Sequence, residues 1–268
     1  MELIKIGAHK RIRAEALGVS RKNIYRPSKQ EQKDLLLKTA IEEVHKKHPS
    51  YGHKRVALEL QLNHKKIRRV MRKYGIKPPR RKVHHYCTRS TSHHTYTNLI
   101  KGLYPKKLHE LWCSDVSFLK YQGKFWYLIT IVDVTSRQVV AADVGKKHDS
   151  ALTLRVIKQA INNTKHTPAI FHSDQGTEFM AKRCTNYLES LSVKVSASDK
   201  ASPWQNGYQE SFFGKFKDEI GDLNRFETVG ELIEEIYHHI HYYNNERIHT
   251  ALKMPPAVYA SSLRDMSS

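Results

Sequence analysis

Three acidic residues in the sequence stand where metal-dependent chemistry could take place. Asp115 follows Trp-Cys-Ser, Asp174 follows Phe-His-Ser, and Glu210 follows Asn-Gly-Tyr-Gln. Carboxylates are preferred ligands of Mg²⁺, and two such ions about 3.5–4 Å apart can activate an oxygen nucleophile and stabilise the leaving oxygen of a phosphodiester. If the three acids converge, they suit the cleavage or joining of nucleic-acid strands. Each acid alone is equally well explained as a structural hydrogen-bonding residue.

The elements that must bring these acids together are predicted by apolar periodicity in the second part of the chain. Asp115 lies on the first expected strand and Asp174 at the carboxyl end of the fourth, the edge where sites collect in α/β sheets. Three antiparallel strands followed by alternating helices and strands predict an α/β fold, a mixed sheet with helices on its faces. The expected strands cover 112–119, 125–134, 138–144, 169–173 and 193–196, and the expected helices 150–161 (capped by Ser150), 178–191, 205–219 and 228–244.

The N-terminal part of the chain shows helical signals instead. The capping box Ser28-Lys-Gln-Glu predicts a helix that ends near residue 48, and a short second helix is expected over 53–60. Asn63 is expected to cap a third helix, and Gly75 to end it. A short helix, a tight turn and a further helix form the layout of a helix-turn-helix module.

The third helix is predicted to have one apolar and one strongly basic face. Ile67, Val70, Met71 and Tyr74 recur at helical spacing and are expected to face a core. The opposite arc carries six cations, which favours contact with DNA phosphates. The alternative is an ordinary helical bundle with a solvated basic face. The six cations are Lys65, Lys66, Arg68, Arg69, Arg72 and Lys73.

The distribution of charge along the 268 residues supports a polyanionic partner. The formal net charge is +20, and residues 1–108 carry 28 basic and 7 acidic side chains, whereas residues 109–268 are nearly neutral. This pattern is typical of a nucleic-acid-binding region, here expected to take double-stranded DNA, and a ribosomal-type or solubilising surface is the alternative. Residues 78–107 are basic and polar and are predicted to form an extended linker.

Composition argues against several other classes of protein. No apolar run approaches the length of a transmembrane helix, and the first residues lack the apolar stretch of a signal peptide, so the chain is expected to be soluble and cytoplasmic. No basic amphipathic helix of the membrane-surface type is seen. Three cysteines without a Cys-x-x-Cys pair argue against a disulfide framework and a zinc site, so the 17 histidines are interpreted as solvated polar residues.

Five motifs in a fixed order are similar to those of one protein family. They are His48-Pro-Ser-Tyr-Gly-His-Lys-Arg, Trp112-x-x-Asp, His172-Ser-Asp-Gln-Gly, Asn206-x-x-x-Glu-Ser-Phe-Phe, and Tyr243-Asn-Asn-Glu-Arg-Ile-His-Thr-Ala-Leu followed by Pro-Pro. With them the sequence resembles bacterial insertion-sequence transposases of the OrfB type, whose catalytic core is close to that of retroviral integrases, in the DDE superfamily. The interval of 35 residues between Asp174 and Glu210 is typical of that core.

The resemblance implies a domain organisation and an activity. The domains would be a helix-turn-helix DNA-binding domain over 1–77, the linker over 78–107, and an RNase H-like integrase core with C-terminal helices over 108–268. The activity would be metal-dependent cleavage and strand transfer of DNA during transposition of an insertion element. A bacterial, nucleoid-associated protein is implied, which forms a homo-oligomer on DNA and in many family members works with a partner from an upstream reading frame.

The resemblance also implies roles for particular residues. Asp115, Asp174 and Glu210 would form the catalytic triad and hold Mg²⁺, for which Mn²⁺ is expected to substitute. Lys217 matches a basic residue characteristic of the group and, like Arg247 of the last motif, is expected to contact DNA. Without the resemblance, Lys217 would be read as an ordinary surface lysine.

Two other functions are compatible with the same sequence. A DNA-binding regulator could keep the helix-turn-helix domain beside an inert second domain, but the presence of all three acids argues against it. An RNase H-like nuclease without joining activity would need the same three acids, so the sequence does not separate cutting from joining.

Overall fold

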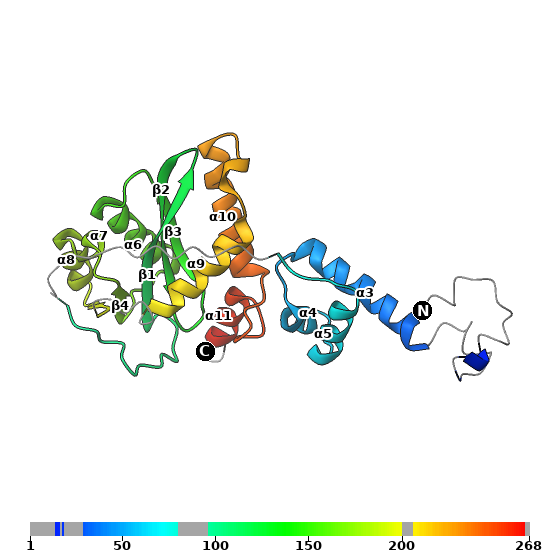
Figure 1. Cartoon of the computed structure of the whole chain (residues 1–268). Coiled ribbons are helices and arrows are strands. Elements are labelled where there is room, and N and C mark those ends of the chain that lie inside the picture. Colours follow the sequence, from blue (N-terminus) through cyan, green and yellow to red (C-terminus); the bar gives the residue numbers. More distant parts are fainter. Residues whose placement is uncertain (1–13, 17, 19–28, 80–95, 200–205, 266–268) are drawn as a thin grey trace. The chain divides into compact units, whose positions relative to one another are not determined.

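The computed structural model describes residues 14–16, 18, 29–79, 96–199 and 206–265. Its internal contacts divide the chain into two units, residues 1–78 and residues 79–268 (Figure 1). In the described residues, no helix is long and apolar enough to cross a membrane. Ser28, the expected cap of the first helix, lies outside them, as does residue 205, the expected start of the helix that carries Glu210.

The described part of the first unit contains the helices α3 (Lys29–Lys47), α4 (His53–Glu59) and α5 (His64–Lys73). Asn63 caps α5, because its side-chain oxygen accepts a hydrogen bond from the Lys65 amide at 2.8 Å. Just beyond the helix lies Gly75, with a φ of +67°. Both ends of α5 therefore confirm the prediction. All three helices contribute to the apolar core, through Leu37, Ile41, Val44, Val56, Ala57, Ile67, Val70 and Met71.

One acidic residue, Asp34 of α3, is buried at the contact with α5. Its carboxylate accepts hydrogen bonds from Arg69 Nη1 at 2.8 Å, Lys73 Nζ at 3.1 Å and Gln30 Nε2 at 2.7 Å. The hydrogen bond from Arg69 is the largest of the effects that hold the pKa of Asp34 far below its usual range. Two of the six cations of α5 thus stabilise the packing of α3 on α5.

The second unit is built on a five-stranded sheet with the order β3-β2-β1-β4-β5. The first three strands pair in antiparallel fashion, and β4 and β5 extend the sheet from β1 in parallel fashion. The mixed sheet confirms the predicted α/β fold. The strands are β1 (Leu111–Tyr121), β2 (Lys124–Asp133), β3 (Val139–Gly145), β4 (Ile170–Ser173) and β5 (Lys194–Ala197).

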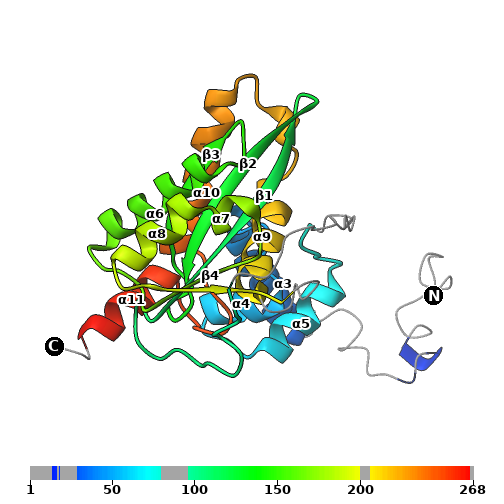
Figure 2. The same cartoon turned by 90° about the vertical axis from the view of Figure 1, so that its left-hand side faces the viewer.

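Helices cover both faces of the sheet, as Figures 1 and 2 show. Because alternate strand residues point to opposite faces, Ile129 and Ile131 of β2 pack with α6 and α8, whereas Leu128 and Val132 pack with α9 and α10. The sheet therefore separates two apolar cores. The helical elements are α6 (Ser150–Thr164), α7 (Thr177–Met180), α8 (Lys182–Ser190), α9 (Gly207–Ile220), the 3₁₀ turn η3 (Leu223–Arg225), α10 (Val229–Asn245) and α11 (Pro256–Asp265).

Two details of this unit differ from the sequence-based prediction. The helix predicted over 178–191 is broken at Ala181, whose extended backbone separates α7 from α8. Asp149, rather than Ser150, caps α6, since its carboxylate accepts hydrogen bonds from the amides of Ala151 and Leu152 at 3.1 and 2.9 Å.

The second half of the predicted linker packs on the second unit. The Leu99 amide donates to Ser196 Oγ at 2.9 Å, and the Ala197 amide donates to the Thr97 carbonyl at 3.3 Å, so this segment follows β5. Ile100 and Leu103 pack against the small apolar cluster around Leu111. Residues 96–107 therefore belong to the folded second unit, because the apolar side chains of this segment pack on the apolar cluster of that unit.

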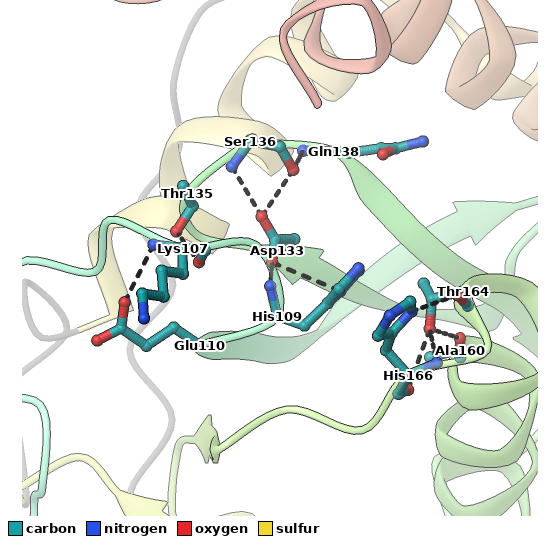
Figure 3. A network of polar contacts seen from close by, with 10 residues as sticks. All are labelled: Lys107, His109, Glu110, Asp133, Thr135, Ser136, Gln138, Ala160, Thr164 and His166. Atoms are coloured by element: carbon teal, nitrogen blue, oxygen red, sulfur yellow. Dashed lines mark hydrogen bonds and ion pairs between the residues drawn. The ribbon is translucent and has the colours of Figure 1, made fainter. Parts of the chain in front are cut away.

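A polar network fixes the chain just before β1 (Figure 3). The buried carboxylate of Asp133 accepts hydrogen bonds from the His109 amide at 2.8 Å and from the amide and hydroxyl of Ser136, both at 2.7 Å. Thr135 donates its hydroxyl proton to the Lys107 carbonyl at 2.8 Å. The turn between β2 and β3 thereby holds the entry to β1, the strand that carries Asp115.

Candidate active site

Two of the three predicted acids are placed by the pairing of β1 with β4. These strands run parallel, with Cys113 beside His172. Asp115 and Asp174 each lie two residues beyond that pair, so the parallel register brings them to neighbouring positions, Asp115 within β1 and Asp174 just past the end of β4. Asp115 accepts a hydrogen bond from the Val116 amide at 2.8 Å, and Asp174 accepts one from the Gly176 amide at 3.0 Å.

A fourth acid, Glu178 of α7, lies beside Asp174. A Cβ atom added to Gly176 would lie 2.8 Å from Glu178 Oε2 and 2.9 Å from Asp174 Oδ1, so the glycine leaves room for both carboxylates. Glu178 is buried, and His148 Nδ1 lies 3.7 Å from its Oε1. Glu178 was missed as a site residue because its position four residues after Asp174, at the start of a helix, is the only signal that the sequence gives for it.

The third acid, Glu210, is exposed in the first turn of α9, and its neighbours fix that turn to the sheet. The side chain of Gln209 is fully buried and donates to the carbonyls of Cys113 and Thr130, while its oxygen accepts the Thr130 hydroxyl proton at 2.9 Å. Asn206 donates to the Ser114 carbonyl at 3.2 Å. These amides attach the start of α9 to β1 and β2 next to Asp115, and sequence reasoning missed this role.

The strand β4, which ends just before Asp174, is attached to β5 and the residue after it by a buried histidine. His172 Nδ1 lies 2.9 Å from Ser196 Oγ, and its Nε2 lies 3.0 Å from Ser198 Oγ. Burial lowers the pKa of His172 to about 4, so its ring is neutral at pH 7. One of the histidines interpreted as solvated is thus a buried structural residue.

The electrostatics of the site show that the acids act on one another. Burial raises the pKa of Asp115 to about 7, and the negative charges of Asp174 and Glu210 act in the same direction. Burial also raises the pKa of Asp174. Lys217, half-buried near the end of α9, lowers the pKa of Asp115 and so lies within electrostatic reach of it. The predicted triad and Lys217 therefore share one region of the structure.

The donor set fits a hard divalent cation. Like charges crowded in a poorly solvated place disfavour ionisation, and a bound cation reverses that effect. In the described part of the chain, no three acidic, histidine or cysteine side chains are already close enough to hold one ion together. The carboxylates are thus neighbours whose oxygens do not converge on a common point.

Arg247 does not lie on a DNA-accessible surface, contrary to the sequence-based expectation. It is 1% exposed, and its guanidinium donates to the Glu219 carboxylate at 2.7–2.9 Å through Nε and Nη2. This ion pair attaches the end of α9 to the segment after α10. The burial of Arg247 depends on a partner 28 residues away, which a sequence motif does not reveal.

In the first unit, all the predicted DNA-contacting cations of α5 are exposed. Arg69 differs from the others because it is bound to the buried Asp34. The predicted DNA-contacting cations that are exposed and take no part in the ion pair with Asp34 are Lys65, Lys66, Arg68 and Arg72.

Comparison with known proteins gives matches along most of the chain. Residues 105–203 and 191–256 match two families described as Integrase core domain, and residues 29–84 match an HTH-like domain. An uncharacterised transposase-like protein of Haemophilus influenzae is 31% identical over 72% of this chain and 90% of its own length. The transposase of IS904 from Lactococcus lactis is 29% identical over 85% of this chain and 94% of its own. The putative transposase InsK of IS150 from Escherichia coli is 28% identical over 81% and 80%.

The fold is shared with a solved retroviral structure. An intasome of simian T-cell lymphotropic virus, determined with a PP2A regulatory subunit, aligns with a TM-score of 0.51 and 15% identity over 81% of this chain and 73% of that one. Together with the mixed sheet, this gives the second unit the RNase H-like fold of integrase catalytic cores. The chain therefore belongs to the insertion-sequence transposases with an integrase core, DDE-type polynucleotidyl transferases that cleave DNA and transfer its strands during transposition.

Proposed function

We propose that Asp115, Asp174 and Glu210 are the catalytic and metal-binding acids of this transposase. The single observation that carries the proposal is that the parallel pairing of β1 with β4 and the attachment of α9 to β1 and β2 bring the three acids together. The raised pKa of Asp115, caused by burial, Asp174 and Glu210, agrees with this arrangement. Three acids arranged in this way on a strand, at a strand end and on a helix repel one another unless a cation lies between them.

The family uses divalent metal ions, and for this chain we propose Mg²⁺, with Mn²⁺ able to substitute. A divalent ion at the site supplies a Lewis acid that activates an oxygen nucleophile and neutralises charge on the leaving oxygen. The protein side chains position the acids. Gln209 and Asn206 hold the first turn of α9 against β1 and β2, so Glu210 approaches Asp115 on a rigid support.

Lys217 is proposed to hold a DNA phosphate beside the acids. Seven residues separate it from Glu210, about two turns of α9, so both side chains extend from similar faces of that helix. Its charge already acts on Asp115. An ammonium in this place attracts a phosphate and counters the negative potential of the carboxylates that the DNA backbone must approach.

The first unit is proposed to be the helix-turn-helix domain that binds double-stranded DNA at the element ends. Its boundary is proposed near residue 77, with residues 78–107 as the connection to the catalytic core of residues 108–268, the second half of that connection being packed on the core. The exposed cations Lys65, Lys66, Arg68 and Arg72 would neutralise phosphates. A homo-oligomer on DNA is proposed as the working form, in the bacterial cytoplasm at the nucleoid, with an upstream-frame partner as a further component.

Oligonucleotides that carry the element ends test this proposal. Asp174→Asn and Glu210→Gln should each lose cleavage and strand transfer in Mg²⁺ or Mn²⁺ and keep DNA binding, because each change removes a ligand charge with little change of shape. Asp218→Asn is the matched control, since it removes a carboxylate of the same helix that is not one of the three proposed acids, and it should stay active. Normal strand transfer by either triad variant would contradict the assignment.

A further inference from the structure

An aromatic surface near the proposed active site has no role in the function described so far. It consists of Phe118 on β1, Phe125 and Tyr127 on β2, and His148 before α6, and it is called the aromatic patch below. Phe118 is 45% exposed and Phe125 is 53% exposed. Large aromatic side chains gathered at a surface are unusual unless they contact a partner.

The aromatic patch is a built surface on one face of the sheet. Phe118 is paired with Tyr127, and Lys120 with Phe125, in the antiparallel register of β1 and β2, so these four side chains share one face. Ring centroids lie 5.2 Å apart for Phe118 and Tyr127, 6.4 Å for Phe118 and Phe125, and 4.6 Å for Tyr127 and His148. Mutual packing therefore fixes the rings while two of them stay open to solvent.

The charge around the aromatic patch fits a polyanion. The hairpin of residues 116–127 contains no acidic residue, and its Lys120 lies on the same face as Phe118 and Phe125. Lys120 is exposed, as is Lys147 next to His148. Lys124 and Lys146 belong to the other face of the sheet, where Lys146 Nζ lies 5.6 Å from the centre of the Trp126 ring. The nearby carboxylate of Asp149 is engaged as the cap of α6.

The aromatic patch adjoins the proposed active site at Asp174. Phe118 lies three residues beyond Asp115 on β1, so these two side chains point to opposite faces of the sheet. The ring of His148 lies 5.6 Å from the ring of Phe118 and 3.7 Å from the Glu178 carboxylate, which adjoins Asp174. A strand bound at Asp174 can thus reach the aromatic patch past Glu178 and His148.

We propose that the aromatic patch binds unpaired bases of the DNA strand that lies in the active site, by stacking them on Phe118 and Phe125. Exposed rings interleaved with lysines are the chemistry that binds single-stranded DNA, since every base has a face to stack and every nucleotide a phosphate to pair. Bases within an intact duplex are already stacked on each other and offer only their phosphates. The proposal rests on the proposed function for the position of the DNA, and it adds a surface that prefers separated strands.

Binding measurements on two DNA probes test the proposal. Both carry the same number of phosphates; one is a blunt duplex, and the other ends in three unpaired nucleotides that include 2-aminopurine. Fluorescence anisotropy in Ca²⁺ gives the affinity, and the emission of 2-aminopurine reports stacking. For the full-length chain, Phe118→Ala combined with Phe125→Ala should weaken binding to the unpaired probe roughly tenfold and restore its emission, with little change for the blunt probe.

Three further variants keep this test decisive. Phe118→Trp should preserve the preference for unpaired ends, whereas Phe118→Leu, which keeps an apolar side chain in place and so protects folding, should lose it. Tyr104→Ala removes an aromatic residue that is 82% exposed outside the aromatic patch and should change nothing. Equal affinity loss for both probes, or none, would overturn the proposal, as would a change of oligomeric state in the patch variants with unaltered DNA binding.

The outcome is separable from that of the proposed function. Asp115→Asn should bind both probes like the wild type while it fails to cleave DNA in Mg²⁺. If Asp115→Asn cleaves, the triad assignment fails and the stacking result still stands or falls on the patch variants. If Asp115→Asn is inactive and the patch variants bind normally, only the stacking proposal fails.

Discussion

Two aspartates, one in each unit, show opposite ways of keeping an acid inside a protein. Asp34 in the first unit is 1% exposed and accepts hydrogen bonds from Arg69 and Lys73, so its pKa lies well below the usual range. Asp115 in the second unit has acidic neighbours, Asp174 and Glu210, and its pKa rises to about 7. The residue type is the same, and the neighbouring charges decide whether the ionised carboxylate is favoured or disfavoured.

In the proposed function, this difference separates a structural acid from a catalytic one. The Asp34 carboxylate has its cations already, so it holds α3 against α5 and has no need of a ligand. Among the described residues, only Lys217 acts on Asp115 with a positive charge, so we propose that a bound cation neutralises the Asp115 carboxylate. Residue type alone would not distinguish the two.

The largest expected effect comes from exchanging the two aspartates for asparagine in turn. Asp115→Asn should abolish cleavage and strand transfer and leave thermal stability unchanged or higher, because a crowded carboxylate is removed. Asp34→Asn should lower the unfolding temperature and leave the chemistry intact on pre-cut ends, because an ion-paired acid is lost. Activity and thermal unfolding of both proteins, measured side by side, check this. Loss of stability in the first and loss of chemistry in the second would reverse the comparison.

The cations of the first unit are expected to divide in the same way. We expect a triple alanine variant of Lys65, Lys66 and Arg68 to bind duplex DNA with a weaker salt dependence. The slope of log K against log salt should become less negative by about 2.7, or about 0.9 for each phosphate that is no longer neutralised. Arg69→Ala should instead act mainly on stability, since Arg69 is bound to Asp34. Binding isotherms of the full chain over a range of salt concentrations measure the slope. An unchanged slope in the triple variant would remove this face of α5 from the DNA interface.

Lys217→Ala is expected to have a smaller effect, on joining rather than on folding. The loss should be about tenfold, or ~1.4 kcal/mol, within the range of a charge-assisted hydrogen bond. Lys217→Arg should recover part of it. Strand-transfer rates on pre-cut ends at low protein concentration are the measurement, and a wild-type rate for the alanine variant would make Lys217 an ordinary surface lysine.

The smallest expected effect is a difference in the sign of pH dependence. Because the folded pKa of Asp115 is raised, the contribution of this residue to stability is present below its unfolded pKa of about 4 and lost as pH rises toward 7. Because the folded pKa of Asp34 is lowered, its contribution is present above pH 4 and lost as pH falls below it. Unfolding free energies of the wild type minus each Asn variant, followed from pH 3 to pH 8 without divalent ions, should therefore slope in opposite directions. If both differences changed with pH in the same direction, the surroundings of Asp115 and Asp34 would shift the two pKa values in the same direction, contrary to the comparison.

The sequence predicts the parts of the fold that depend on local signals. The cap at Asn63, the strand that carries Asp115 and the helix that carries Glu210 follow from capping chemistry and periodicity, and the structure has all three. The choice between Asp149 and Ser150 as the cap of α6 is not decided locally, since both residue types cap well. The sequence around Ala181 contains no glycine or proline that would predict the break between α7 and α8.

The contacts that position the site are beyond such reasoning because they join distant segments. Gln209 is polar and sits in a helix, so only the structure reveals that its amide lies buried between Cys113 and Thr130. Arg247 is read as a surface cation until Glu219 is placed against it. In both cases the environment of a side chain is made by residues whose proximity no periodicity encodes.

The amide contacts of α9 also determine when the active site can exist. The hydrogen bonds of Gln209 and Asn206 to β1 and β2 span 79 to 96 residues of chain, whereas the β1–β2–β3 meander closes through neighbouring strands. Contacts of long sequence separation form late, since loop closure must precede them. A chain that is still being synthesised therefore displays Asp115 and Asp174 before Glu210 is in place. We expect the protein to become able to cut DNA only when α9 has packed on β1 and β2, so that a chain without a folded α9 leaves the chromosome intact.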